Sequence, residues 1–105
     1  MNYRDECDRL ATNVLRQLVR YPDLTEGRRN VVHTILDRRA NVHQKGYDAG
    51  QVLLDVLGGY DVQELHDRAI EAAQRASDTK KFTEAEQSQG VADALWEYIQ
   101  DRSDT

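Results

Sequence analysis

The stretch RRNVVHTILDRRANVHQKGYDAGQVLLDV, residues 28–56, contains a series of positions separated alternately by four and by three residues, without interruption. Positions at these intervals lie on one face of a helix. This alternation is typical of the seam of a coiled-coil-like helix. A single helix over the stretch would measure about 43 Å at about 1.5 Å per residue. A compact chain of this length has a radius of gyration of only about 13 Å. The seam positions are Arg28, Val32, Ile35, Arg39, Val42, Gly46, Ala49, Leu53 and Val56.

Gly46 and Gly50, one helical turn apart, allow two structures for this seam. In the first, the helix breaks within residues 44–47 and a shorter helix covers residues 47–57. In the second, the helix continues and the missing side chains let another helix approach closely. An interior glycine costs about 1 kcal/mol relative to alanine, which is too little to decide between them. The sequence leaves both structures open.

Further helical patterns lie on both sides of the seam. Apolar residues at helical spacing predict helices over residues 3–20, 62–76 and 84–101. Pro22 ends the first helix and Gly58-Gly59 ends the central segment. No stretch shows the sustained alternation of apolar and polar residues, with a period of two, that is typical of β-strands. The sequence therefore predicts an all-α protein, a four- or five-helix bundle, with an elongated shape around one long central helix as an option.

Capping chemistry predicts where the helices begin. A side-chain oxygen before a helix accepts a hydrogen bond from a free backbone N–H, and an acid three residues later suits the positive first turn. Four residues meet both conditions, and we expect helix starts at Asn2, Asp23, Asp61 and Thr83.

The composition predicts a single helical domain over residues 1–105 in the cytoplasm. Hydrophobic residues make up 39% and charged residues 31% of the chain, a balance typical of globular proteins. The single cysteine excludes an internal disulfide and suits a reducing compartment. The sequence shows no signal-peptide pattern and no apolar run long enough to span a membrane. It also lacks metal-ligand spacings and phosphate-binding loops, so we expect no metal, no cofactor and no enzymatic activity.

The net charge of −5 divides unevenly along the chain. Residues 1–45 carry nine Lys/Arg and six Asp/Glu, a balance of +3, and residues 46–105 carry five and thirteen, a balance of −8. Arg28 and Arg39 occupy seam positions, where a charge needs a partner. The acidic half of this chain or of a second copy can supply one, and a polar seam residue fixes the register of an assembly. The alternative is that both side chains reach out to solvent.

Two short strings, RRNVVH at residues 28–33 and RRANVH at residues 38–43, each place an arginine five residues before a histidine. This spacing resembles the R-x4-H motif of HEPN ribonucleases, small helical-bundle proteins in which Arg and His flank a scissile phosphate at a dimer interface. The resemblance implies a histidine that acts as general acid or base and an arginine that clamps the phosphate. A ribonuclease or toxin–antitoxin component using Arg28 with His33, or Arg38 with His43, is therefore one alternative function.

The same region suggests binding surfaces. A basic stripe over residues 28–45 contains a single acid and can neutralise phosphates, so a nucleic-acid-binding regulator is a second alternative. Its residues are Arg28, Arg29, Arg38, Arg39 and Lys45. Amphipathic aromatic residues are common anchors of protein interfaces, and the candidates here are Tyr47, Tyr60, Trp96 and Tyr98.

These patterns favour a non-enzymatic function. The extended seam and the charge asymmetry predict a small cytoplasmic interaction module that binds a macromolecular partner and self-associates. Regulators, adaptors and inhibitors, including those encoded by phages and plasmids, have this profile. We expect a protein partner and a homo-oligomer, with nucleic acid disfavoured and no membrane contact.

Overall fold

The protein was analysed as a computed structural model, which describes residues 2–57 and 61–103. Its described residues form helices and connecting turns, without strands, which confirms the all-α prediction. The helices are α1 (Tyr3–Asp8), α2 (Thr12–Val19), α3 (Glu26–Leu57), α4 (Val62–Asp78) and α5 (Phe82–Ser103).

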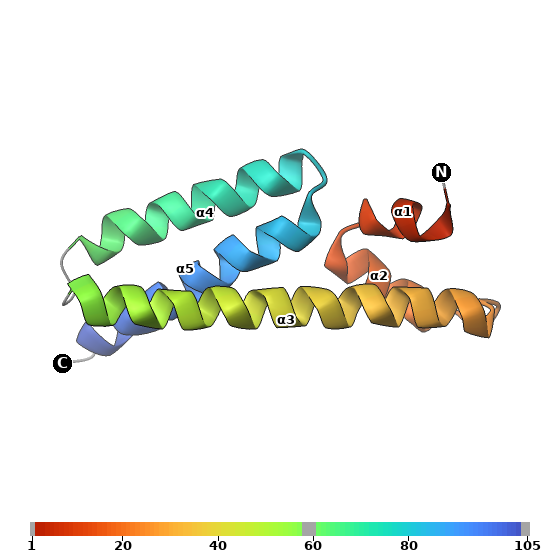
Figure 1. The fold of residues 1–105 in the computed structure, drawn as a ribbon, viewed down its shortest axis with the longest axis horizontal. Coiled ribbons are helices and arrows are strands. Elements are labelled where there is room, and N and C mark those ends of the chain that lie inside the picture. Colours follow the sequence, from red (N-terminus) through yellow and green to blue (C-terminus); the bar gives the residue numbers. More distant parts are fainter. Residues whose placement is uncertain (1, 58–60, 104–105) are drawn as a thin grey trace.

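Helix α3 runs the length of the molecule (Figure 1). It continues through Gly46 and Gly50 over 32 residues, which corresponds to about 48 Å at about 1.5 Å per residue. The whole molecule measures 50 × 25 × 19 Å and has a radius of gyration of 16.2 Å. The elongated option with a continuous central helix is therefore the one observed.

The glycines of α3 allow α5 to pack backbone against backbone. A Cβ atom on Gly46 would lie 2.0 Å from the carbonyl oxygen of Gln87, and one on Gly90 of α5 would lie 2.1 Å from the carbonyl oxygen of His43. One turn further along α3, a Cβ atom on Gly50 would lie 2.7 Å from the Cβ atom of Ala94. Any larger side chain at these glycines would force the two helices apart.

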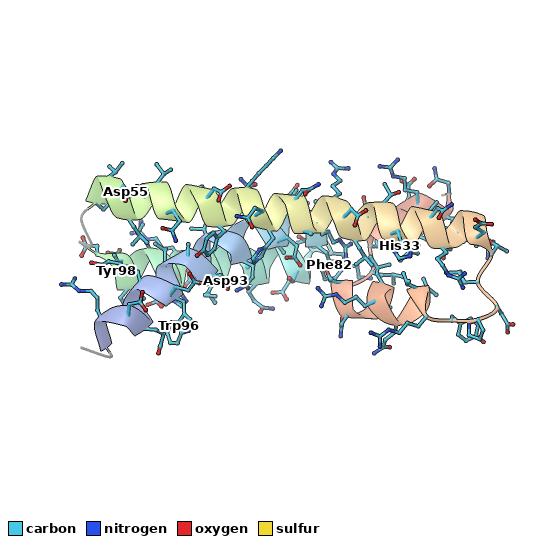
Figure 2. All side chains as sticks on the ribbon, turned by 90° about the horizontal axis from the view of Figure 1, so that it is seen from below. His33, Asp55, Phe82, Asp93, Trp96 and Tyr98 are labelled. Carbon is cyan, nitrogen blue, oxygen red and sulfur yellow. The ribbon has the colours of Figure 1, made fainter. Side chains whose placement is uncertain are left out.

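The remaining helices pack at different places along this pair. Helix α4 lies along α5 on the side away from α3, while α1 and α2 pack against the first half of α3 (Figures 1 and 2). Most buried apolar residues of α4 and α5 are alanines, Ala73, Ala85, Ala92 and Ala94, beside Val62 and Leu95. In the second half of the molecule α5 thus contacts both α3 and α4.

The N-terminal region departs from the predicted helix over residues 3–20. The chain leaves the helical conformation after Asp8, and Ala11 is extended with ψ 153°. The break turns α2 relative to α1, so that Cys7 and Leu15 both enter a core with Val32 and Ile35. It also frees the carbonyl of Asp8, which a continuous helix would have used internally.

Two of the four predicted helix starts differ from the structure. Asn2 caps α1, because its Oδ1 accepts from the backbone N–H of Asp5 at 2.9 Å, and Asp61 precedes α4 without a side-chain cap. Helix α3 begins after Thr25 rather than Asp23, with the Thr25 hydroxyl accepting from the N–H of Arg28. Helix α5 begins at Phe82, so Thr83 lies inside it.

The seam is only partly covered by the rest of the chain. Val32, Ile35, Arg39 and Gly46 are buried. Beyond them, the buried face of α3 passes to Gly50, since a straight helix repeats every 3.6 residues and drifts away from a strict seven-residue pattern. Ala49 and Val56 at the end of the seam are therefore exposed, and Leu53 is half-buried.

We expect Gly46→Ala to destabilise the protein although alanine is the better helix former. The gain in helix propensity is about 1 kcal/mol, whereas separating two packed backbones costs about 1–3 kcal/mol or more. The matched control is Gly27→Ala, because nothing lies within 4 Å of a Cβ atom at that position. Urea unfolding should show a lower midpoint for the first variant and an equal or higher one for the second. Equal midpoints for both variants would contradict the close approach of α3 and α5.

Candidate functional site

Arg39 forms a buried polar junction between the two halves of the molecule. Its side chain is 1% exposed, and its guanidinium donates from Nη1 to the Thr12 hydroxyl at 3.2 Å and from Nη2 to the Asp8 carbonyl at 3.1 Å. The Thr12 hydroxyl in turn donates to Oε1 of Glu86 on α5 at 3.2 Å. Arg39 thus connects α1, α2, α3 and α5 through one network.

The surroundings of Arg39 act on its charge in opposite directions. Burial lowers the pKa of the guanidinium from its ordinary value, while the nearby charges of Asp8 and Glu86 raise it. The guanidinium carbon also lies 5.5 Å from the centre of the Phe82 ring, where cation–π attraction adds to the contact. Burial is the larger effect, so the pKa is lowered overall, and the partners of the seam charge come from this chain and include an acid of its second half.

A pocket of about 460 Å³ opens beside this junction. His43 enters it from α3, and its Nε2 lies 2.7 Å from Oδ2 of Asp93 on α5. The side-chain amide of Gln89 donates to the other oxygen of that carboxylate at 2.9 Å. A carboxylate that orients an imidazole is a common acid–base arrangement, and here it also joins α3 to α5. The other lining residues are Thr12, Arg16, Leu36, Asp37, Arg39, Ala40 and Glu86.

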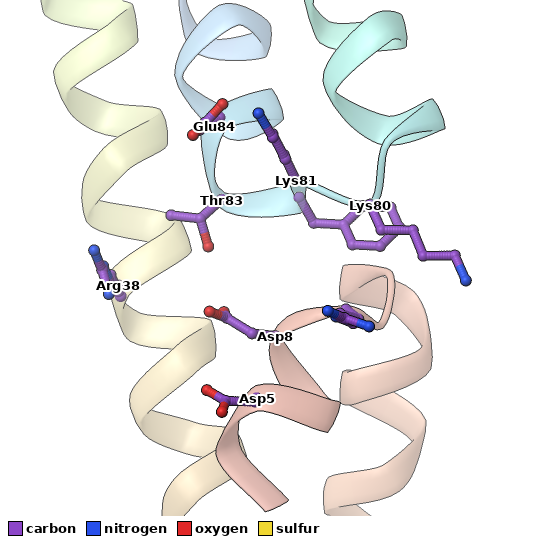
Figure 3. A pocket seen from close by; sticks show the side chains of 9 residues that line it. Asp5, Asp8, Arg38, Lys80, Lys81, Thr83 and Glu84 are labelled. Atoms are coloured by element: carbon purple, nitrogen blue, oxygen red, sulfur yellow. The ribbon is translucent and has the colours of Figure 1, made fainter. Parts of the chain in front are cut away.

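A second pocket, of about 410 Å³, lies between α1, α3 and the start of α5 (Figure 3). Asp5 and Asp8 extend into it from α1, and Arg38 lies on the α3 side. Four bases (Arg9, Arg38, Lys80 and Lys81) and three acids (Asp5, Asp8 and Glu84) line it together with Phe82 and Thr83. The mixture of charges does not select a ligand of either sign.

The structure separates the two members of each R-x4-H pair. Residues five apart on a helix point about 140° away from each other at about 3.6 residues per turn. Accordingly, Arg38 lines the pocket in Figure 3, whereas His43 lines the pocket beside Arg39. Arg28 stacks on the Tyr3 ring at 4.9 Å, and His33 is exposed. The ribonuclease function stays a hypothesis, and no geometry described here favours it.

The basic stripe is spread around α3 rather than along one face. Arg39 is buried, and Arg29 donates to the carbonyls of Val19, the last residue of α2, and of Tyr21 after it. Arg38 and Lys45 are exposed. Binding of nucleic acid through these residues stays a hypothesis, with fewer free cations on one surface than the sequence suggested.

The predicted interface anchors have different surroundings. Trp96 is 47% exposed and its ring lies 5.4 Å from that of His66 on α4. Tyr47 is half-buried and donates a short hydrogen bond to Glu97, which together with burial raises the pKa of the Tyr47 hydroxyl. Tyr98 accepts from Arg102 at 3.0 Å. Tyr60 lies outside the described residues.

Sequence reasoning missed one of the two most exposed apolar residues of α3, Val52. Val52 is 59% and Val56 is 75% exposed, but only Val56 belongs to the predicted seam. Val52 lies three residues after Ala49, and residues three apart share one face of a helix. The position of Ala49 in the seam could therefore have indicated Val52 as well.

No helix within the described ranges is long and apolar enough to span a membrane. In the same part of the chain, no group of three or more His, Cys, Asp or Glu side chains is placed to hold a metal ion. Comparison of the chain with models of protein families, with curated proteins and with solved structures finds no match.

We expect Arg39→Lys to destabilise the protein by about 1–3 kcal/mol, because lysine keeps the charge but cannot bridge Asp8 and Thr12 with a planar fork. Arg38→Lys, the exposed neighbour, is the control and should change stability by less than about 0.5 kcal/mol. Urea unfolding of both variants measures the difference. Indistinguishable midpoints would show that the junction does not hold the two halves together.

Proposed function

We propose that this protein is a small cytoplasmic interaction module that self-associates and binds a macromolecular partner through the last turns of α3. The surface concerned, here called the α3 stripe, consists of Ala49, Val52, Leu53 and Val56. The main support for this proposal is that Val52 and Val56, on consecutive turns of a continuous helix, are 59% and 75% exposed.

The spacing of the α3 stripe matches a known mode of recognition. Its four residues stand at positions i, i+3, i+4 and i+7, the pattern with which an amphipathic helix anchors itself in an apolar groove. We therefore expect a protein partner that offers such a groove. A regulator, adaptor or inhibitor acts by this kind of contact and needs no chemistry of its own.

The α3 stripe is also held rigid before any partner arrives. Gly50 lies one residue after Ala49 and packs directly against Val91 and Ala94 of α5. This contact fixes the backbone of the stripe, and fixing a binding segment in advance lowers the entropy lost on association. A preformed helix that exposes its valines is thus suited to binding.

The double variant Val52→Ser/Val56→Ser should lose the partner while keeping the fold, because both side chains are already exposed. Burying a valine contributes about 1.5 kcal/mol or more, so removing two should weaken binding about tenfold or more. The control Asn41→Ser/Asp55→Asn changes two exposed positions of α3 outside the stripe. Affinity capture from the native cell with quantitative mass spectrometry identifies the partner, and titration of that purified partner measures the loss.

A partner retained equally by the serine variant and the control would refute the role of the α3 stripe. Recovery of no specific partner by the wild-type protein would refute the interaction function. Circular dichroism on each variant separates a lost contact from a lost fold.

A further inference from the structure

Helix α2 and the C-terminal half of α5 lie on the same side of α3. In Figure 1 both pass behind α3, and in Figure 2 both lie below it, with Trp96 extending away from α3 on that side. The contacts agree, since Arg16 of α2 and His43 of α3 line one pocket and His43 pairs with Asp93 of α5. This surface is here called the rear face.

The two ends of the rear face differ in charge. At the α2 end, Arg16 and Arg20 are exposed one turn apart, and residues 12–21 contain no acid. At the α5 end, the rings of His66 and Trp96 lie 5.4 Å apart, and each residue is followed in the chain by an exposed acid, Asp67 and Glu97. The carboxylate of Glu97 accepts a hydrogen bond from the Tyr47 hydroxyl of α3.

Each end also exposes apolar or aromatic surface beside its charges. Tyr21, directly after α2, is 57% exposed, and Ile70 of α4 is exposed one turn from His66. The two ends are therefore complementary: one has an aromatic group beside arginines, and the other has a tryptophan beside acids. Aromatic residues anchor an interface, and charges of opposite sign fix its register.

We propose that a second copy of this chain docks antiparallel on the rear face, so that α2 of each copy lies against the Trp96 end of the other. This inference names the surface of the self-association proposed above and rests on it. A two-fold axis across the middle of the rear face makes both contacts at once, as in a closed isologous dimer.

The rear face runs along the long axis of the molecule. Seen down its shortest axis, the whole molecule measures 50 × 25 Å, and the rear face is the part of this outline formed by α2, α3 and α5. A specific interface needs about 800 Å² from each partner. Both ends of the rear face therefore have to take part in the contact.

Charge reversal with a complementary mixture tests the proposal. Arg16→Glu/Arg20→Glu makes both ends of the rear face acidic, and Asp67→Arg/Glu97→Arg makes both ends basic. Each variant alone should dimerise at least about tenfold more weakly than the wild type, because like charges then face each other. An equimolar mixture of the two should form a heterodimer, since acidic ends meet basic ends at both contacts. Sedimentation velocity over a range of concentrations measures all three samples.

The control is Arg4→Glu/Lys45→Glu. It changes the net charge by −4, as Arg16→Glu/Arg20→Glu does, but at exposed positions outside the rear face, and it should leave dimerisation within about twofold of the wild type, apart from weak long-range repulsion. Trp96 is the single tryptophan of the chain, so its emission should shift to shorter wavelength as the dimer forms.

The outcomes separate this inference from the self-association on which it rests. A wild-type protein that is monomeric at every concentration overturns both. A dimer that resists both charge reversals and leaves the Trp96 emission unchanged overturns the rear face alone. Weakened variants that fail to pair when mixed overturn the antiparallel arrangement.

Discussion

The backbone contact between α3 and α5 determines the architecture of this protein. At Gly46, Gly50 and Gly90 the two helices approach so closely that a Cβ atom at any of them would clash with the other helix. Two backbones in contact leave little side-chain surface between them to bury, so the contact depends on shape rather than on a large apolar core. Because α5 occupies this side of α3, α4 can pack only on the far side of α5. The resulting layer covers half of α3 and leaves the other half to α1 and α2.

Arg39 supplies the specificity that apolar packing of those first helices lacks. Apolar contacts are not directional, so the short helices α1 and α2 could settle at more than one position along α3. The guanidinium allows one position, in which the Asp8 carbonyl and the Thr12 hydroxyl meet its two terminal nitrogens. Burying a charge adds little net stability even when it is paired. The role of Arg39 in this fold is to align the two halves, with Glu86 of α5 included through Thr12.

The sequence predicted the helices well, because the spacing of apolar residues and the proline, glycine and capping residues at helix ends are local properties of the chain. It left the course of α3 at Gly46 open, since the deciding contact is with Gln87, more than forty residues away. It missed the break between α1 and α2 for a similar reason, because the freed carbonyl of Asp8 bonds to Arg39. The predicted pairing of Thr83 with Glu86 failed because α5 begins at Phe82, so that Thr83 lies inside the helix, and Glu86 accepts from Thr12. The course of α3 and the break after α1 depend on partners from distant parts of the chain, whereas the shifted start of α3 at Thr25 is a local difference.

The arrangement of α3, α5 and α4 has a further consequence for function. In the second half of the molecule α5 is the main helix that packs against α3, so much of the α3 surface stays accessible there. The α3 stripe and the rear face are separate surfaces, so a partner and a second copy need not compete. In an antiparallel dimer formed through the rear faces, the C-terminal ends of the two α3 helices, and with them the two stripes, lie near opposite ends of the assembly. Such a dimer would be divalent, and a target with two grooves would be held more tightly than one stripe allows, provided that both can engage at once.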